Sequence, residues 1–179
     1  MIFRWFESLI DAFKEPVDGM PPKPVWRFYV FYLRQVWPVF AAAIVVGFMV
    51  AIVEVSLFGF IGRIVDMAKG VPAEDFFQRH GRELLGMALV ALVARPVFNS
   101  LHDLLVNQAI VPSLTNRIRW QNHRYVIRQS LGFFQNDYAG RIANRIMQTG
   151  GSLRESAVQI VDAIWYIVIY TGSAVALFA

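Results

Sequence analysis

Three long apolar runs, separated by polar segments, dominate the pattern of the chain. Residues 36–53 contain no charged side chain, and the apolar pattern continues past Glu54 to about residue 62. A second run begins near residue 84, and a third extends to residue 179. Because about 20 residues of helix cross the hydrocarbon core of a bilayer, the pattern predicts an all-α membrane bundle with spans at about 36–62, 84–111 and 157–179.

Small and polar residues mark particular faces of these spans. Ala43, Gly47 and Ala51 recur every fourth residue of the first span, a face that would let another helix approach closely. The second span becomes polar on one face in its second half, where hydrogen-bonding groups cannot face lipid and must face other helices or a wet cavity. A helix from residue 84 to about 131, with Pro112 tolerated as a kink, would be about 70 Å long and would extend far beyond the membrane.

Two charged residues lie within the predicted spans at similar depths. By helix rise, Glu54 lies about 12 Å and Arg95 about 16 Å below the outer ends of their helices. We expect the two to pair across the first hairpin, since an isolated charge at such depth costs at least about 2.5 kcal/mol. The alternative is that each faces a water-filled cavity separately. The candidate intramembrane polar path or ion pair comprises Glu54, Arg95, Asn99 and Asp103.

The first 24 residues differ from the rest of the chain. Residues 1–14 place apolar side chains on one helical stripe and charges on the other side, which predicts an amphipathic helix. Such a helix lies either at a membrane interface or on the protein's own surface. Residues 15–24 contain four Pro and one Gly and are therefore a linker. The aromatic and basic residues 25–35 predict an elbow helix along the cytoplasmic membrane surface.

Composition and charge support a membrane protein and exclude several other classes. Hydrophobic residues make up 56% of the chain and charged residues only 17%, which is too apolar for an ordinary soluble domain. Seven of the 17 Lys and Arg residues fall between Arg117 and Arg154, beside an apolar span. This placement fits the positive-inside rule, with a cytoplasmic N-terminus and a cytoplasmic loop at residues 112–156, better than nucleic-acid binding.

Catalytic and metal-binding motifs are missing from the sequence. It has no Cys, and its three His residues lack the spacing of a metal site. No Gly-x-x-x-x-Gly-Lys-Ser/Thr occurs, so no P-loop can cradle ATP phosphates. We find no nucleophile with a positioned base. We therefore assign no catalytic, cofactor-binding or metal-binding residue, and we do not expect this chain alone to hydrolyse ATP.

The polar, basic segment 129–155 carries the most specific signal. It begins with the aromatic pair Phe133-Phe134 and passes through a turn-prone stretch to Gly140-Arg141, where a new helical pattern starts. These features and the later Asn144-Arg145 and Leu153-Arg154-Glu155 resemble the first intracellular loop of ABC exporters of the type I transmembrane fold. The predicted contacts with a nucleotide-binding domain are made by Phe133, Phe134, Gln135, Asn136, Asp137, Tyr138, Gly140 and Arg141.

The resemblance covers residues 25–179 in layout and implies a function. In that family the loop carries a coupling helix, which transmits the ATP-driven closure of nucleotide-binding domains to the membrane helices. It implies that three further spans and a nucleotide-binding domain with ATP and Mg complete the protein, fused or as a separate chain. It also implies a second transmembrane half, as a homodimer or heterodimer, a bacterial inner membrane, and a lipid-like, drug-like or other amphiphilic substrate moved by alternating access.

Two other functions are compatible with the residues. A non-transporting membrane scaffold could use the same basic loop to recruit a soluble partner or anionic lipid. A permease subunit of a binding-protein-dependent importer resembles this chain less, both in the long second helix and in the loop. The substrate is not encoded in any recognisable motif.

Overall fold

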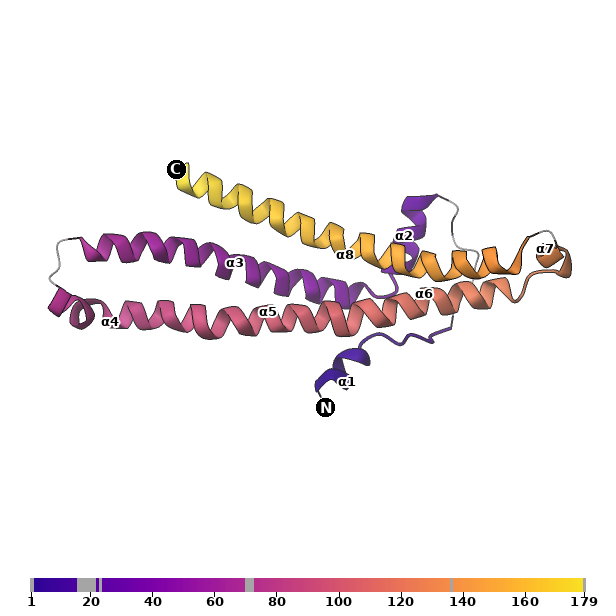
Figure 1. Cartoon of the computed structure of the whole chain (residues 1–179), viewed down its shortest axis with the longest axis horizontal. Helices are drawn as coiled ribbons and strands as arrows, with labels where there is room; N and C mark the ends of the chain where they lie inside the picture. Colours follow the sequence, from indigo (N-terminus) through magenta and orange to yellow (C-terminus); the bar gives the residue numbers. More distant parts are fainter. Residues whose placement is uncertain (1, 16–21, 23, 70–72, 136, 179) are drawn as a thin grey trace. The chain divides into compact units, whose positions relative to one another are not determined.

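The chain is helical throughout its described part. The computed structural model describes residues 2–15, 22, 24–69, 73–135 and 137–178, and within these residues it contains no strand (Figure 1). The helices are α1 (Ile2–Glu7), α2 (Val25–Leu33), α3 (Trp37–Ala68), α4 (Ala73–Leu89), η1 (Val90–Ala94), α5 (Arg95–Asp103), η2 (Leu104–Ile110), α6 (Val111–Val126), α7 (Leu131–Gln135) and α8 (Ala139–Phe178). The predicted all-α fold is confirmed.

Three helices in the described part are long and apolar enough to cross a membrane. They cover Trp37–Ala68, Asp75–Val126 and Ala139–Ala174, and each contains one of the predicted apolar runs or most of it. The second comprises 52 residues, more than twice the roughly 20 that a bilayer requires. These lengths fit a helical membrane bundle whose helices extend beyond the bilayer.

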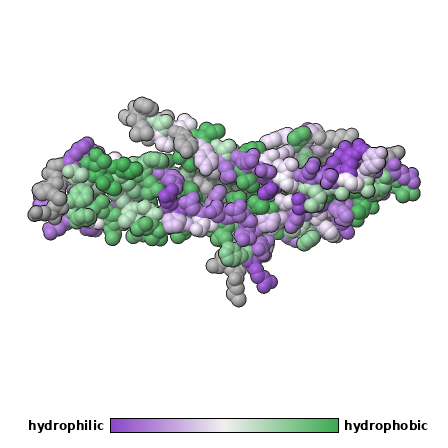
Figure 2. Space-filling model, in the orientation of Figure 1, coloured by the Kyte–Doolittle hydropathy of each residue, from purple (hydrophilic) through white to green (hydrophobic). Residues whose placement is uncertain are grey.

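The chain divides into two compact units. Unit 1 comprises Met1–Ala43 and Asp103–Val161, and unit 2 comprises Ile44–His102 and Asp162–Ala179. Hydrophobic residues cover much of the visible surface of unit 2 (Figure 2). The visible surface of unit 1 is more mixed, with many hydrophilic residues (Figure 2). The apolar surface of unit 2 is the kind that lipid covers.

The second long helix passes two prolines by widening its turns. η1 and η2 are π-helical, and each ends shortly before a proline. The N–H of Arg95 bonds the carbonyl of Val90, and the N–H of Val111 bonds that of Val106, so both bonds span five residues. Proline has no N–H to donate, and a π-type turn before it accommodates the lost bond and the bulk of the ring. The expected tolerance of Pro112 is therefore achieved by a π-helical turn.

The first and third apolar helices meet closely in unit 2. A Cβ built on Gly47 of α3 would lie 2.9 Å from the indole Nε1 of Trp165 on α8 and 3.6 Å from Cδ2 of His102. The Trp165 ring also packs against Phe48, with ring centroids 5.4 Å apart. The glycine within the small-residue pattern of the first span is thus where another helix approaches, as the spacing predicts.

Unit 1 is organised around α6. Leu114 and Ile118 are fully buried there. The hydroxyl of Tyr32 on α2 donates a hydrogen bond of 3.0 Å to Asn122 Oδ1, and burial raises the pKa of Tyr32 to about 12, so this donor keeps its proton at neutral pH. These contacts fix α2 against α6. A helix is therefore present where the elbow helix is expected, while its position on a membrane surface stays a prediction.

The N-terminal helix is shorter than the sequence predicts. The amphipathic stripe predicts a helix over residues 1–14, but α1 ends at Glu7 and turns follow. The carboxylate of Asp11 accepts the backbone N–H of Phe13 at 3.0 Å, a local bond that competes with helix hydrogen bonding. Ile10 is nevertheless buried. Most of the predicted linker, residues 16–21 and 23, lies outside the described residues.

Gly150 is a point of close helix contact. The Gly150-Gly151-Ser152 sequence suggests a local break before the third span, but α8 runs through it without interruption, and this expectation is wrong. A Cβ on Gly150 would lie 2.9 Å from the backbone oxygen of Thr115 and 3.0 Å from Cγ of Arg119, both on α6. The glycine is needed because α8 packs against the α6 backbone at this position.

The two adjacent glycines give a matched test of this contact. We expect Gly150→Ala to destabilise the protein by about 1–3 kcal/mol, because a backbone atom must move to admit the methyl group. We expect Gly151→Ala to be neutral or to stabilise by up to about 1 kcal/mol, since its Cβ meets no atom within 4 Å and alanine favours helix. Thermal unfolding in detergent measures both, and equal melting temperatures for the two variants would contradict the packing.

Candidate functional site

The segment between α6 and α8 presents aromatic side chains to solvent. α7 is a short helix that carries Phe133 and Phe134, whose rings lie perpendicular with centroids 5.4 Å apart. Each residue is 40% exposed, and Leu131 in the same helix is 73% exposed. A cluster of exposed large apolar side chains is typical of an interaction surface. α7 therefore has the composition of a docking element.

A carboxylate organises the start of α8. Asp137 lies just before the helix and accepts the backbone N–H of Tyr138 at 2.9 Å. It also pairs with Arg141 Nε at 2.7 Å and Arg145 Nη1 at 3.6 Å. An acidic side chain at a helix N-terminus is stabilised by the helix dipole. Asp137 thus holds together the first two turns of α8.

Two predicted contact residues project from this junction. Tyr138 is 78% exposed, and the guanidinium of Arg141 lies 5.3 Å from the centroid of its ring. A cation–π contact of this kind holds both side chains in a defined arrangement. Gly140 is exposed, and a Cβ there would meet no atom within 4 Å.

The structure thus brings together only part of the predicted coupling set. Asp137, Tyr138 and Arg141 are in mutual contact, and Gln135 is exposed at the end of α7. Asn136 lies outside the described residues. The contact of this loop with a nucleotide-binding domain stays a prediction.

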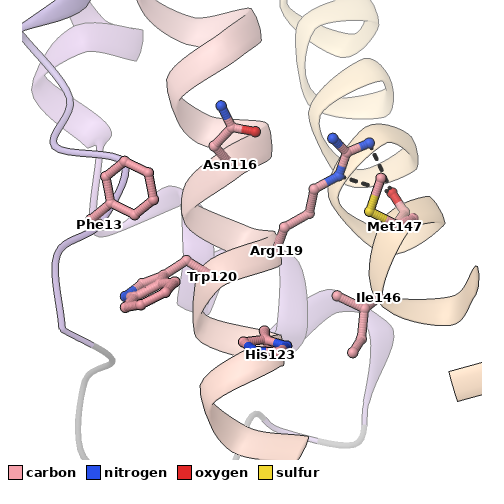
Figure 3. Close-up of a pocket in the computed structure, with 7 residues that line it drawn as sticks. All are labelled: Phe13, Asn116, Arg119, Trp120, His123, Ile146 and Met147. Atoms are coloured by element: carbon pink, nitrogen blue, oxygen red, sulfur yellow. Dashed lines mark hydrogen bonds between the residues drawn. The ribbon is translucent and has the colours of Figure 1, made fainter. Parts of the chain in front are cut away.

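Sequence reasoning missed a contact that joins α6 to α8 above the loop. Arg119 donates from both Nε and Nη2 to the carbonyl of Met147, at 3.2 Å each (Figure 3). The bond borders a shallow pocket of about 380 Å³ in unit 1. Its lining residues are Phe13, Asn116, Arg119, Trp120, His123, Ile146 and Met147. No sequence signal identifies this contact, because the two residues are 28 positions apart and the acceptor is a backbone atom.

The predicted charged pair is in contact within unit 2. Arg95 donates from Nε to Oε1 of Glu54 at 2.8 Å and from Nη2 to Oε2 at 3.4 Å. Two-point contact of this kind is the strong geometry for guanidinium and carboxylate. Asn99 donates to the backbone carbonyl of Arg95 at 3.0 Å, and Asp103 is exposed. The pairing of Glu54 with Arg95 is the arrangement expected from their depths, and a role of the four residues in a polar path stays a prediction.

The described residues contain no group of three or more His, Asp or Glu side chains that could hold a metal ion. Three features indicate an integral membrane protein. They are the apolar surface of unit 2, the three long apolar helices, and the paired charges within those helices.

Comparison with known proteins finds a sequence similar to this chain. The chain is 29% identical over 171 residues to an uncharacterized ABC transporter ATP-binding protein of Haemophilus influenzae. The match covers 94% of this chain and 27% of the relative, so the chain spans about a quarter of that protein's length. No family model matches the chain. No solved structure matches it.

Proposed function

We propose that this chain forms the first three spans of the membrane domain of an ATP-driven exporter. The observation that carries the proposal is the similarity of nearly the whole chain to about a quarter of an ABC transporter ATP-binding protein. The chain has no P-loop, so the ATP-binding part of such a protein would lie outside the matched quarter. The matched quarter supplies membrane helices.

The segment 129–155 is the proposed coupling loop. The exposed aromatic residues of α7 would dock on the nucleotide-binding domain, and Tyr138, Gly140 and Arg141 would shape the contact. ATP and Mg would be bound by that domain. Because Asp137 holds the start of α8 together and Arg119 ties α6 to α8, a push on the start of α8 would be passed into both long helices.

The membrane arrangement follows from the charge distribution. The basic segment around α6, α7 and the start of α8 would lie in the cytoplasm by the positive-inside rule, together with the N-terminus. The resemblance to ABC exporters adds a bacterial inner membrane as the proposed location. A second transmembrane half, as a homodimer or heterodimer, would complete a route for an amphiphilic substrate, lipid-like or drug-like. Alternating access would then follow from motion of the long helices relative to the second half.

The reading frame beyond Ala179 tests this proposal. We expect three further apolar runs of about 20 residues each, followed by a P-loop sequence. A stop codon directly after Ala179 would instead favour the membrane scaffold, whose basic loop recruits a partner.

A further inference from the structure

The N-terminal segment lies against the second long helix. Within unit 1, α1 packs against η2, which itself carries buried apolar side chains. Phe6 is 5% exposed and Ile10 is 3% exposed, so one side of the segment is buried as completely as the core. The segment 2–15 is therefore docked on its own protein along that side.

Two further contacts hold the segment along α6. They are the edge-on ring contact of Phe13 with Trp120 at 5.5 Å and the ion pair of Glu15 with Arg124 at 3.7 Å. The two contact residues are two positions apart in the segment, and their partners are four positions apart on one face of the helix. Together with the packing of α1 on η2, these contacts fix the direction of the segment as well as its position.

The same segment also exposes large apolar side chains away from its buried side. Phe3 is 57% exposed, Trp5 60% and Leu9 37%. Trp5 lies in α1 and Leu9 in the turn that follows it, and both are close in sequence to the buried Phe6 and Ile10. Two buried and three exposed large apolar residues within eight positions are more than docking on the protein requires.

The position of η2 indicates what covers these side chains. Counted along the chain, η2 begins 20 residues after Leu84, where the second apolar run starts, and 20 residues of helix rise about 30 Å, the thickness of the hydrocarbon core. α1 therefore packs at the level where the second span leaves the hydrocarbon. Trp at this level buries its ring in the acyl boundary while its N–H stays hydrated.

The net charge of segment 2–15 does not attract it to anionic lipid headgroups. Segment 2–15 carries two basic and three acidic residues, a formal charge of −1. These residues are Arg4, Lys14, Glu7, Asp11 and Glu15. Attraction to anionic headgroups would not drive binding, so insertion would rest on burial of apolar side chains.

We propose that the segment 2–15, which begins with α1, is a membrane-surface anchor whose exposed residues Phe3, Trp5 and Leu9 insert at the headgroup–acyl boundary of the bilayer. Its buried side, with the contacts along α6, transmits this anchorage to the second long helix and holds η2 at a fixed depth. That the anchor lies in the cytoplasmic leaflet rests on the membrane arrangement in the proposed function.

Single-cysteine labelling in vesicles tests the anchor. The chain has no native cysteine, so Trp5→Cys and Leu9→Cys can each carry one environment-sensitive fluorophore. Ser8→Cys, exposed on the polar side of the same turn, is the matched control. Leu92→Cys, 76% exposed in η1, reports on a membrane span. The probes are lipids with a spin label near the headgroup end of the acyl chain, and iodide in the water phase.

We expect labels at positions 5 and 9 to emit at shorter wavelength than the label at position 8 and to be quenched mainly by the spin-labelled lipid. The result should be the same in phosphatidylcholine vesicles and in vesicles containing phosphatidylglycerol. Equal iodide quenching at positions 5, 8 and 9, with position 92 still quenched by lipid, would overturn the anchor and point to a soluble partner on this face. Loss of lipid quenching at position 92 as well would refute the membrane arrangement itself.

Discussion

Reversing either charge of the Glu54–Arg95 pair is expected to impair membrane folding strongly, and reversing both is expected to restore it. Glu54→Arg leaves two cations facing each other, and Arg95→Glu leaves two anions, at a depth where an unpaired charge costs about 2.5–3.5 kcal/mol. A penalty of that size shifts the folding equilibrium by roughly 100-fold. The double reversal keeps one cation and one anion in contact.

The measurement is the fraction of each variant that is folded and protease-protected after reconstitution into vesicles. A double-mutant cycle on these fractions isolates the energy of the pair from the cost of each single change. The ion pair Asp66–Lys69 is the matched control: it is also 2.8 Å long, but both side chains are more than 70% exposed. Reversals there should change little. A double reversal of Glu54 and Arg95 no better than the single ones would rule out the pair and favour two separately hydrated charges.

The features that the sequence predicts well are those that repeat along one helix. The apolar runs, the small-residue spacing around Gly47 and the uninterrupted helix through Pro112 all depend on periodicity within a single element. The Glu54–Arg95 contact also belongs here, because a membrane gives depth as a second coordinate, and two charges at similar depths in a hairpin have few other partners.

Two features that the sequence does not predict are contacts with the backbone of a neighbouring helix. The sequence around Gly150 suggests a helix break, but in the structure a Cβ at Gly150 would lie 2.9 Å from the backbone oxygen of Thr115 on α6. Arg119 bonds a backbone carbonyl, which every residue has, so its partner leaves no trace in the sequence. The short α1 illustrates a third cause: Asp11 forms a local bond that helical periodicity does not reveal.

In the proposed coupling loop, Gly140→Val is expected to lower ATP hydrolysis by the complete protein while leaving the membrane helices folded. A Cβ at Gly140 meets no atom of the described residues within 4 Å, so we expect the substitution to disturb mainly a surface that contacts this position from outside. Allosteric coupling energies are typically 1–3 kcal/mol, and we therefore expect a loss of about tenfold. Arg141→Glu should add to the loss, because it removes the cation that stands over Tyr138 and places a like charge beside Asp137.

The assay is ATP hydrolysis by the purified complete protein in nanodiscs, with the unfolding temperature measured on the same samples. Gly151→Val is the control, because its Cβ also meets no atom of the described residues within 4 Å but lies ten positions beyond Arg141, the last predicted contact residue, and it should retain full activity. Full activity of Gly140→Val and Arg141→Glu would show that this loop is a solvated connector. Equal losses in Gly140→Val and Gly151→Val would assign the effect to helix substitution in general. A loss confined to the variants at Gly140 and Arg141 would support a motor domain that contacts them, because a Cβ at either glycine meets no atom of the described residues within 4 Å.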